Sequence, residues 1–163
     1  MDGVQSNMSA KSSIIIRPAA SADIPQLAKL LSLLFAQEAD FTPHIERQTH
    51  ALHLIIQQPE LGRILCAEDN DGEIVGMVSV MFSISTAEGG PAAWLEDMVV
   101  HPEQRGLNIG TQLLQAAISQ AQATGCTRVS LLTDKDNHAA LRFYQRAGFI
   151  TSHMLPLRIM LRD

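Results

Sequence analysis

The sequence predicts one domain of the mixed α/β class, in which a mostly antiparallel central sheet has helices on both faces. Two features of the chain support this class. Antiparallel strands come first, joined by the hairpin turn Asp71-Gly72, and a strand–helix–strand unit of the kind that makes a parallel pair comes later. A length of 163 residues with 46% apolar residues is sufficient for one hydrophobic core without disulfide bonds or metal.

Each predicted element has a local signal. The β-branched run at residues 14–17 stops at Pro18, as is typical of a first strand. Ser21 or Asp23 caps the next segment, in which apolar residues recur with helical spacing. Gly125 ends a later helix as its C′ residue. We expect strands at residues 14–17, 63–68, 74–83, 93–100, 128–133 and 149–161, and helices at residues 25–35, 43–58, 106–123 and 137–147.

The composition excludes several classes of protein. The chain has 12 Lys and Arg against 17 Asp and Glu, and this net charge of −5 is unfavourable for binding nucleic acid. No run of about 18 apolar residues predicts a membrane span. Cys66 and Cys126 lack metal or redox spacing, which is typical of free thiols in the cytoplasm. We expect residues 1–12 to form a disordered tail and residues 13–163 to form the single domain.

The most informative segment is the strand end and glycine-containing loop at residues 99–111. The loop becomes the first turn of a helix, whose unpaired backbone N–H groups and dipole favour an anion. Gly106 and Gly110 let a phosphate approach the backbone. The loop has neither the lysine of a Walker loop nor the spacing of a dinucleotide fingerprint. From this loop alone, two interpretations have equal weight: an anion-binding site, or an ordinary helix start that contains glycines.

Together with a second motif, the loop resembles a known family. Residues 105–110 resemble the acyl-CoA pyrophosphate loop, Arg/Gln-x-x-Gly-x-Gly/Ala, of the GNAT superfamily of N-acetyltransferases. Residues 137–149 resemble the family's second signature, and the resemblance covers residues 14–161. The family usually has Gly where this chain has Asn108. Because Asn tolerates a left-handed backbone better than other non-glycine residues, we expect the loop to keep its shape.

The resemblance implies direct transfer of an acetyl group from acetyl-CoA to an amine of a small molecule or peptide in a ternary complex. It also implies a splayed parallel strand pair, which leaves backbone N–H groups near Val99 and Val100 for the thioester oxygen. The residues then expected to contact acetyl-CoA are Met98, Val99, Val100, Arg105, Gly106, Leu107, Asn108, Ile109, Gly110, Thr111, Asn137 and Tyr144.

Two adjacent carboxylates compete for the role of the base that takes a proton from the amine. Strict alternation along the strand places Glu96 with Trp94 and Met98 on one face, and Asp97 on the other. Family members often carry a carboxylate at the position of Glu96, so Glu96 is the first candidate and Asp97 the second. A structural role for both remains open. For the acid that protonates the CoA thiolate, the resemblance implies Tyr144, with a core tyrosine as the alternative.

The resemblance places the acceptor pocket at the first two helices and the loop before the central strand, residues 27–58 and 86–91. That region contains groups compatible with a polyamine, an aminoglycoside, an amino acid or a peptide N-terminus: Glu38, Asp40, His44 and Glu46. His50 and His53 share a helix face without a third zinc ligand, so no metal is predicted. Family members often form homodimers. The alternative function is a non-catalytic acyl-CoA-binding sensor or partner module on the same fold.

Overall fold

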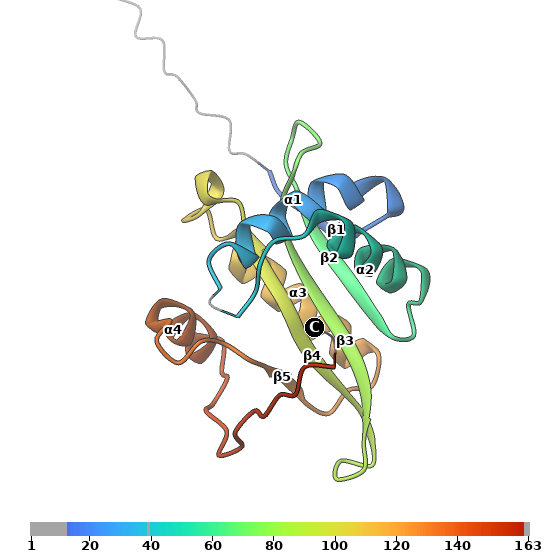
Figure 1. Ribbon diagram of the computed structural model, residues 1–163, viewed down its shortest axis with the longest axis vertical. Coiled ribbons are helices and arrows are strands. Elements are labelled where there is room, and N and C mark those ends of the chain that lie inside the picture. The colour runs from blue at the N-terminus through green and yellow to red at the C-terminus, as the bar shows by residue number, and fades with distance from the viewer. Residues whose placement is uncertain (1–12, 39, 162–163) are drawn as a thin grey trace, which may run out of the picture. The chain divides into compact units, whose positions relative to one another are not determined.

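The computed structural model describes residues 13–38 and 40–161 (Figure 1). These residues form a mixed α/β structure with a five-stranded sheet in the order β1-β2-β3-β4-β5, which confirms the predicted fold class. The strands are β1 (Ile15–Pro18), β2 (Gly62–Glu68), β3 (Ile74–Ser85), β4 (Gly90–Val100) and β5 (Val129–Leu131). The helices are α1 (Ile24–Phe35), α2 (Ile45–Gln57), α3 (Ile109–Ala123) and α4 (His138–Arg146).

The sheet is antiparallel from β1 to β4 and ends in one parallel pair, β4 and β5. The parallel register joins residues 93–95 of β4 to all of β5, whereas β4 continues to Val100. Among the described residues, the pairing with β5 therefore ends at Leu95. The rest of β4 runs on without this neighbour.

Helices cover both faces of this sheet, as predicted: Figure 1 shows α1 and α2 in front of it and α3 behind it. On the first face, Leu27 and Leu31 of α1 and Leu52 of α2 are buried against Ile64 and Met77 of the sheet. The buried residues of α1 follow the helical spacing read from the sequence.

On the other face, α3 packs tightly on β3 because Gly76 has no side chain there. A Cβ at Gly76 would lie 3.0 Å from Leu113 Cδ1 and 3.2 Å from the Val99 carbonyl oxygen. The side chains of Ile109, Leu113 and Leu114 on α3 are fully buried. This packing fixes the start of α3, and with it the loop that precedes the helix.

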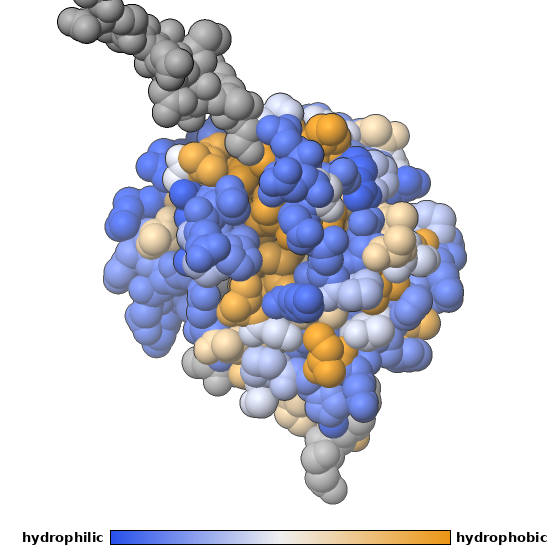
Figure 2. Space-filling model, turned by 90° about the horizontal axis from the view of Figure 1, so that it is seen from above, coloured by the Kyte–Doolittle hydropathy of each residue, from blue (hydrophilic) through white to orange (hydrophobic). Residues whose placement is uncertain are grey.

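The chain divides into two compact units, one up to Leu132 and one from Thr133 onward. The first unit holds the sheet with α1, α2 and α3, and the second holds α4. A single domain over residues 13–163 stays a prediction, and the predicted tail at residues 1–12 lies outside the described residues. On the face seen in Figure 2, hydrophilic side chains predominate and hydrophobic ones are exposed between them.

Two predicted elements differ from the structure. The strand expected at residues 149–161 is not formed, and the apolar side chains after Phe149 are exposed, for example Leu157 at 96%. A strand requires a partner for its backbone groups, and β-branched or apolar composition alone does not supply one. The helix expected from Gly106 begins at Ile109 instead. Gly106 and Asn108 have positive φ values of 81° and 64°, which no right-handed helix can include.

Candidate active site

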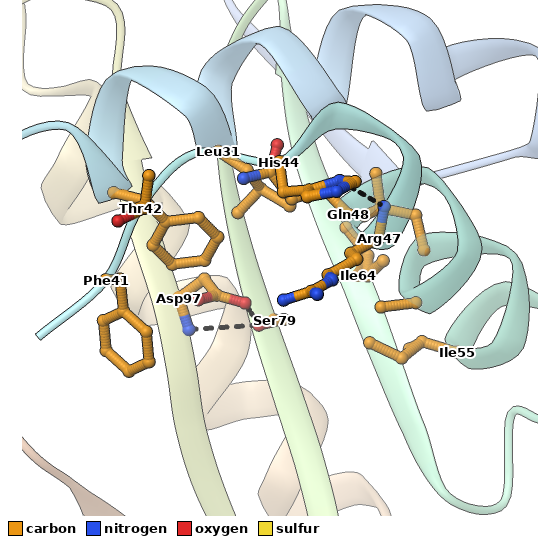
Figure 3. A pocket seen from close by; sticks show the side chains of 13 residues that line it. Leu31, Phe41, Thr42, His44, Arg47, Gln48, Ile55, Ile64, Ser79 and Asp97 are labelled. Atoms are coloured by element: carbon orange, nitrogen blue, oxygen red, sulfur yellow. Dashed lines mark hydrogen bonds between the residues drawn. The ribbon is translucent and has the colours of Figure 1, made fainter. Parts of the chain in front are cut away.

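A hollow of about 270 Å³ opens in the first unit, between the first two helices and the middle of the sheet. Most of its wall is apolar, and Figure 3 shows the polar groups Asp97, Ser79, Arg47 and His44 around it. The lining residues are Leu31, Phe35, Phe41, Thr42, His44, Arg47, Gln48, Ala51, Leu52, Ile55, Ile64, Ser79 and Asp97. The hollow therefore coincides with the helical part of the predicted acceptor pocket.

Residues 86–91, the other part of the predicted acceptor pocket, are not among the lining residues. Of the polar groups named from the sequence, His44 lines the hollow, and Glu38, Asp40 and Glu46 do not. Sequence reasoning missed Arg47 and Ser79. Arg47 lies one residue beyond Glu46, and only its place in the first turn of α2, which His44 caps, fixes which way it projects.

The floor of the hollow is shaped by a β-bulge in β4. The register pairs Val78 with Met98 and Val80 with Leu95, so Ser79 alone stands opposite two residues of β4. Such an extra residue bends the strand and resets the alternation of its side chains. Asp97 lines the hollow, whereas Glu96, the first candidate from the sequence, is exposed and is not a lining residue.

Asp97 and Ser79 are joined by two hydrogen bonds across the bulge (Figure 3). The Asp97 backbone N–H donates to Ser79 Oγ at 3.1 Å, and the Ser79 hydroxyl donates to Asp97 Oδ2 at 2.9 Å. Burial raises the pKa of Asp97, the hydrogen bond from Ser79 opposes this rise, and the charge of Glu96 adds to it. Asp97 is thus a carboxylate with increased basicity at the edge of an apolar hollow, as a general base requires.

The opposite wall is formed by the beginning of α2. His44 caps this helix, and its Nδ1 accepts a hydrogen bond from the Arg47 backbone N–H at 3.5 Å. The side chain of Arg47 extends toward Ser79 and Asp97 (Figure 3). Behind it, the Gln48 side chain is buried and its Oε1 accepts a hydrogen bond from Ser32 at 3.0 Å. The backbone of Arg47 is therefore held in place by the capped first turn of α2.

The loop before α3 has the geometry of an anion site. The Arg105 Nε–H donates to the Val100 carbonyl at 3.3 Å, and Gly106 and Asn108 adopt left-handed backbone conformations. Asn108 thus takes the conformation expected when it replaces Gly. Ile109 is buried and anchors the helix start, whereas Arg105, Leu107 and Thr111 are exposed. The first N–H groups of α3 point out of the helix end, where a phosphate can accept them.

Asn137 and Tyr144 belong to the second compact unit. Asn137 caps α4, since its Oδ1 accepts a hydrogen bond from the Ala140 backbone N–H at 3.1 Å. The ring of Tyr144 packs edge-on against Phe143 and Phe149, with centroids 5.1 and 5.7 Å away. The structure thus explains their positions within α4, while their roles toward acetyl-CoA stay predictions.

Two further features bear on the class of protein. Within residues 13–38 and 40–161, no helix has the length and apolar content needed to cross a membrane. In the same part of the chain, no three His, Cys, Asp or Glu side chains gather into a group that could hold a metal ion.

Comparisons with known proteins show which family the chain belongs to. The family model described as the acetyltransferase (GNAT) family matches residues 27–149. An aminoalkylphosphonate N-acetyltransferase of Salmonella typhimurium is 30% identical over 138 residues, covering 85% of this chain and 86% of the relative. A glucosamine 6-phosphate N-acetyltransferase of Trypanosoma brucei brucei is 28% identical over 137 residues, covering 73% and 88%.

Among solved structures, an aminoglycoside N-acetyltransferase in complex with CoA superposes with a TM-score of 0.78. It is 18% identical, and the match covers 93% of this chain and 97% of that one, which shows a common fold. The family match spans most of α1, all of α2, the bulged strand β4 and the loop before α3. The chain is therefore an enzyme of the GNAT acetyltransferase family.

Proposed function

We propose that this enzyme transfers the acetyl group of acetyl-CoA directly to an amine of a small molecule bound in the hollow, within a ternary complex. The observation that carries this proposal is the position of Asp97. This carboxylate lies at the floor of the hollow, on the part of β4 beyond its pairing with β5. An amine bound in the hollow then lies next to a base. The base stands on a part of β4 whose backbone groups are not paired with β5.

Asp97 is the base in this proposal. An ammonium ion has no lone pair, so it must lose a proton before its nitrogen can attack the thioester carbon. Asp97 takes that proton, the nitrogen–carbon bond forms, and the carbon–sulfur bond breaks with its electron pair leaving on sulfur. The second proton that the nitrogen loses on becoming an amide balances the protonation of the CoA thiolate. Backbone N–H groups near Val99 and Val100 stabilise the charge that grows on the carbonyl oxygen. Glu96, the first candidate from the sequence, is exposed and outside the hollow.

The loop at residues 105–111 fits the pyrophosphate of acetyl-CoA. Its left-handed residues Gly106 and Asn108 turn the chain into the start of α3, whose N–H groups favour an anion. The acetyl thioester is the activated acyl group that this co-substrate supplies. The exposed Arg105 adds a positive charge next to the same turn.

Direct transfer is also supported by the state of the cysteines. A two-step route through an acylated cysteine needs a nucleophilic thiolate at the site. Cys66 is fully buried, and burial raises the pKa of its thiol to about 11. Neither Cys66 nor Cys126 lines the hollow. The relatives named for an aminoalkylphosphonate and for glucosamine 6-phosphate support a small-molecule acceptor over a peptide.

The test combines binding and turnover. Acetyl-CoA at 100 times its Kd is expected to stabilise the fold by about 2.7 kcal/mol, measured as a rise in Tm. Gly110→Asp is expected to abolish the rise by placing a carboxylate at the helix start. Gly90→Asp is the matched control, since nothing lies within 4 Å of an added Cβ there.

Turnover is followed as thiol released from acetyl-CoA with a panel of amines. Direct transfer predicts intersecting lines in double-reciprocal plots with both substrates varied, whereas parallel lines contradict it. A rise in Tm with acetyl-CoA but no thiol release with any amine would identify an acyl-CoA sensor instead. Absence of any rise at millimolar acetyl-CoA would contradict the assignment of the loop.

A further inference from the structure

The hollow carries opposite charges on its two sides. Asp97 lies on the sheet side, and the guanidinium of Arg47 reaches in from α2 (Figure 3). No ion pair joins the two, and within the described part of the chain Arg47 has no carboxylate partner. Arg17 pairs with Asp23 and Arg128 with Glu88, whereas Arg63 and Arg105, like Arg47, form no ion pair among the described residues.

The rest of the wall around these two charged side chains is apolar. The walls are formed by Leu31 and Phe35 of α1, by Leu52 and Ile55 of α2, and by Ile64 of β2. A ligand that fills this space displaces water from the apolar walls, and both charged side chains then need a partner on the ligand. A group of one sign cannot satisfy both side chains.

We propose that the acceptor is an amine that also carries an acidic oxygen group and an apolar side chain, as an amino acid or its phosphonate analogue does. This inference rests on the proposed function. The amine faces Asp97, which takes its proton, and the acidic group faces Arg47. The planar guanidinium offers paired N–H donors that match both carboxylate and phosphonate oxygens. The apolar side chain contacts the walls formed by α1 and α2.

The same arrangement disfavours a polyamine or any acceptor with a second cation. Such an acceptor would place a second positive charge near the guanidinium of Arg47, and like charges repel. The acidic side chains that made a polycation compatible with the sequence, Glu38, Asp40 and Glu46, are not lining residues.

The test compares acceptors that share one carbon skeleton: leucine, 1-amino-3-methylbutylphosphonate and 3-methylbutylamine. Each is assayed with acetyl-CoA by thiol release on the wild-type chain, on Arg47→Gln and on Arg47→Lys. Arg128→Gln is the matched control, because it removes an exposed arginine that pairs with Glu88 outside the hollow. The comparison within each acceptor cancels differences in amine basicity.

Arg47→Gln is expected to lower kcat/KM for the two acidic acceptors about 10- to 100-fold, the range for a hydrogen bond to a charged group. It should leave 3-methylbutylamine within about twofold, and Arg47→Lys should lie between. Arg128→Gln should change none of them. The acidic acceptor with the higher kcat/KM identifies the anion that the site prefers.

Unchanged kcat/KM for leucine and the phosphonate in Arg47→Gln would overturn the inference and leave the proposed function standing. An equal loss of kcat/KM for all three acceptors would also overturn the inference, because it would mean that Arg47 acts on the fold or on acetyl-CoA. Failure of the wild-type chain to acetylate any amine would overturn the proposed function, and this inference with it.

Discussion

Ser79 of β3 is hydrogen-bonded twice to Asp97 of β4, once to its backbone N–H and once to its carboxylate. The pair sits where one residue of β3 faces two of β4. The bulge thus aims Asp97 into the hollow, and the Ser79 hydroxyl holds the carboxylate in place and helps to keep it ionised. The Ser79 contact thus orients the proposed base and partly offsets the rise in its pKa that burial causes.

Ser79→Ala tests this link. Removal of a hydrogen bond that favours the ionised carboxylate raises the pKa of Asp97 further, so less base is ionised at a given pH. The acidic limb of the kcat/KM–pH profile is therefore expected to move to higher pH. Ser79→Thr, which keeps a hydroxyl, should restore it. Ser83→Ala on the same strand is the control, since Ser83 bonds to the Ala92 carbonyl away from the hollow. An unmoved limb in a folded Ser79→Ala would contradict the assignment of Asp97.

Asp97→Asn is expected to lower kcat by about 10²- to 10⁴-fold, the usual contribution of a general base. The loss should shrink as pH rises and the free amine becomes more abundant in solution. Glu96→Gln, one residue away, is the matched control and should lose less than tenfold. The reverse order of the two variants would return the role of base to Glu96.

Asp97→Asn should also raise the thermal stability of the fold at neutral pH. Because folding raises the pKa of Asp97, the folded state binds this proton more tightly than the unfolded chain does. Its stability therefore falls as pH rises through the window between the usual carboxyl pKa and the raised one. Asn cannot ionise, so Asp97→Asn is expected to have a higher Tm than wild type at pH 7. The difference should vanish at low pH, where Asp97 is protonated in both states. A variant less stable than wild type at pH 7 would contradict this linkage.

The sequence predicted the sheet and the loop well because their signals are local. The hairpin at Asp71-Gly72, the helical spacing of α1 and the cap at Gly125 each depend on neighbouring residues alone. The bulge left no such signal, because one extra residue changes the register of β4 without changing its apolar character. Alternation separates Asp97 from Glu96, but it does not tell which of the two carboxylates faces the hollow.

The charge of the hollow was also hidden from the sequence. Residues 38–46 are rich in acidic groups, yet the side chain that reaches into the hollow is Arg47. Which neighbour projects inward depends on where α2 begins, and helix boundaries shift easily by one or two residues. The prediction of a strand at residues 149–161 was wrong for a related reason. Whether a segment pairs with a sheet depends on residues far away in the sequence.

Asn108 provides a test of the loop. Its φ of 64° is one that Gly adopts without cost and that Ala adopts at a cost of about 1 kcal/mol. Asn108→Ala is therefore expected to lower the free energy of unfolding and to weaken acetyl-CoA binding, measured by denaturation and by calorimetry. Asn108→Gly should leave both close to wild type. Weaker binding in Asn108→Gly with unchanged stability would show that the Asn side chain itself contacts the phosphate.

The role of Tyr144 is tested by removal of its hydroxyl alone. Tyr144→Phe keeps the ring and its edge-on packing against Phe143 and Phe149, so Tm and acetyl-CoA affinity should change little. If the hydroxyl protonates the departing thiolate, kcat falls by about 10²-fold, the low end for an acid acting on a leaving group that is already fair. A purely structural tyrosine gives the opposite pattern, a lower Tm with near-normal kcat in the folded fraction. Measurement of kcat, acetyl-CoA Kd and Tm on one preparation separates the two. Because the acid stabilises sulfur only as its bond to carbon breaks, the loss must appear in kcat and not in Kd.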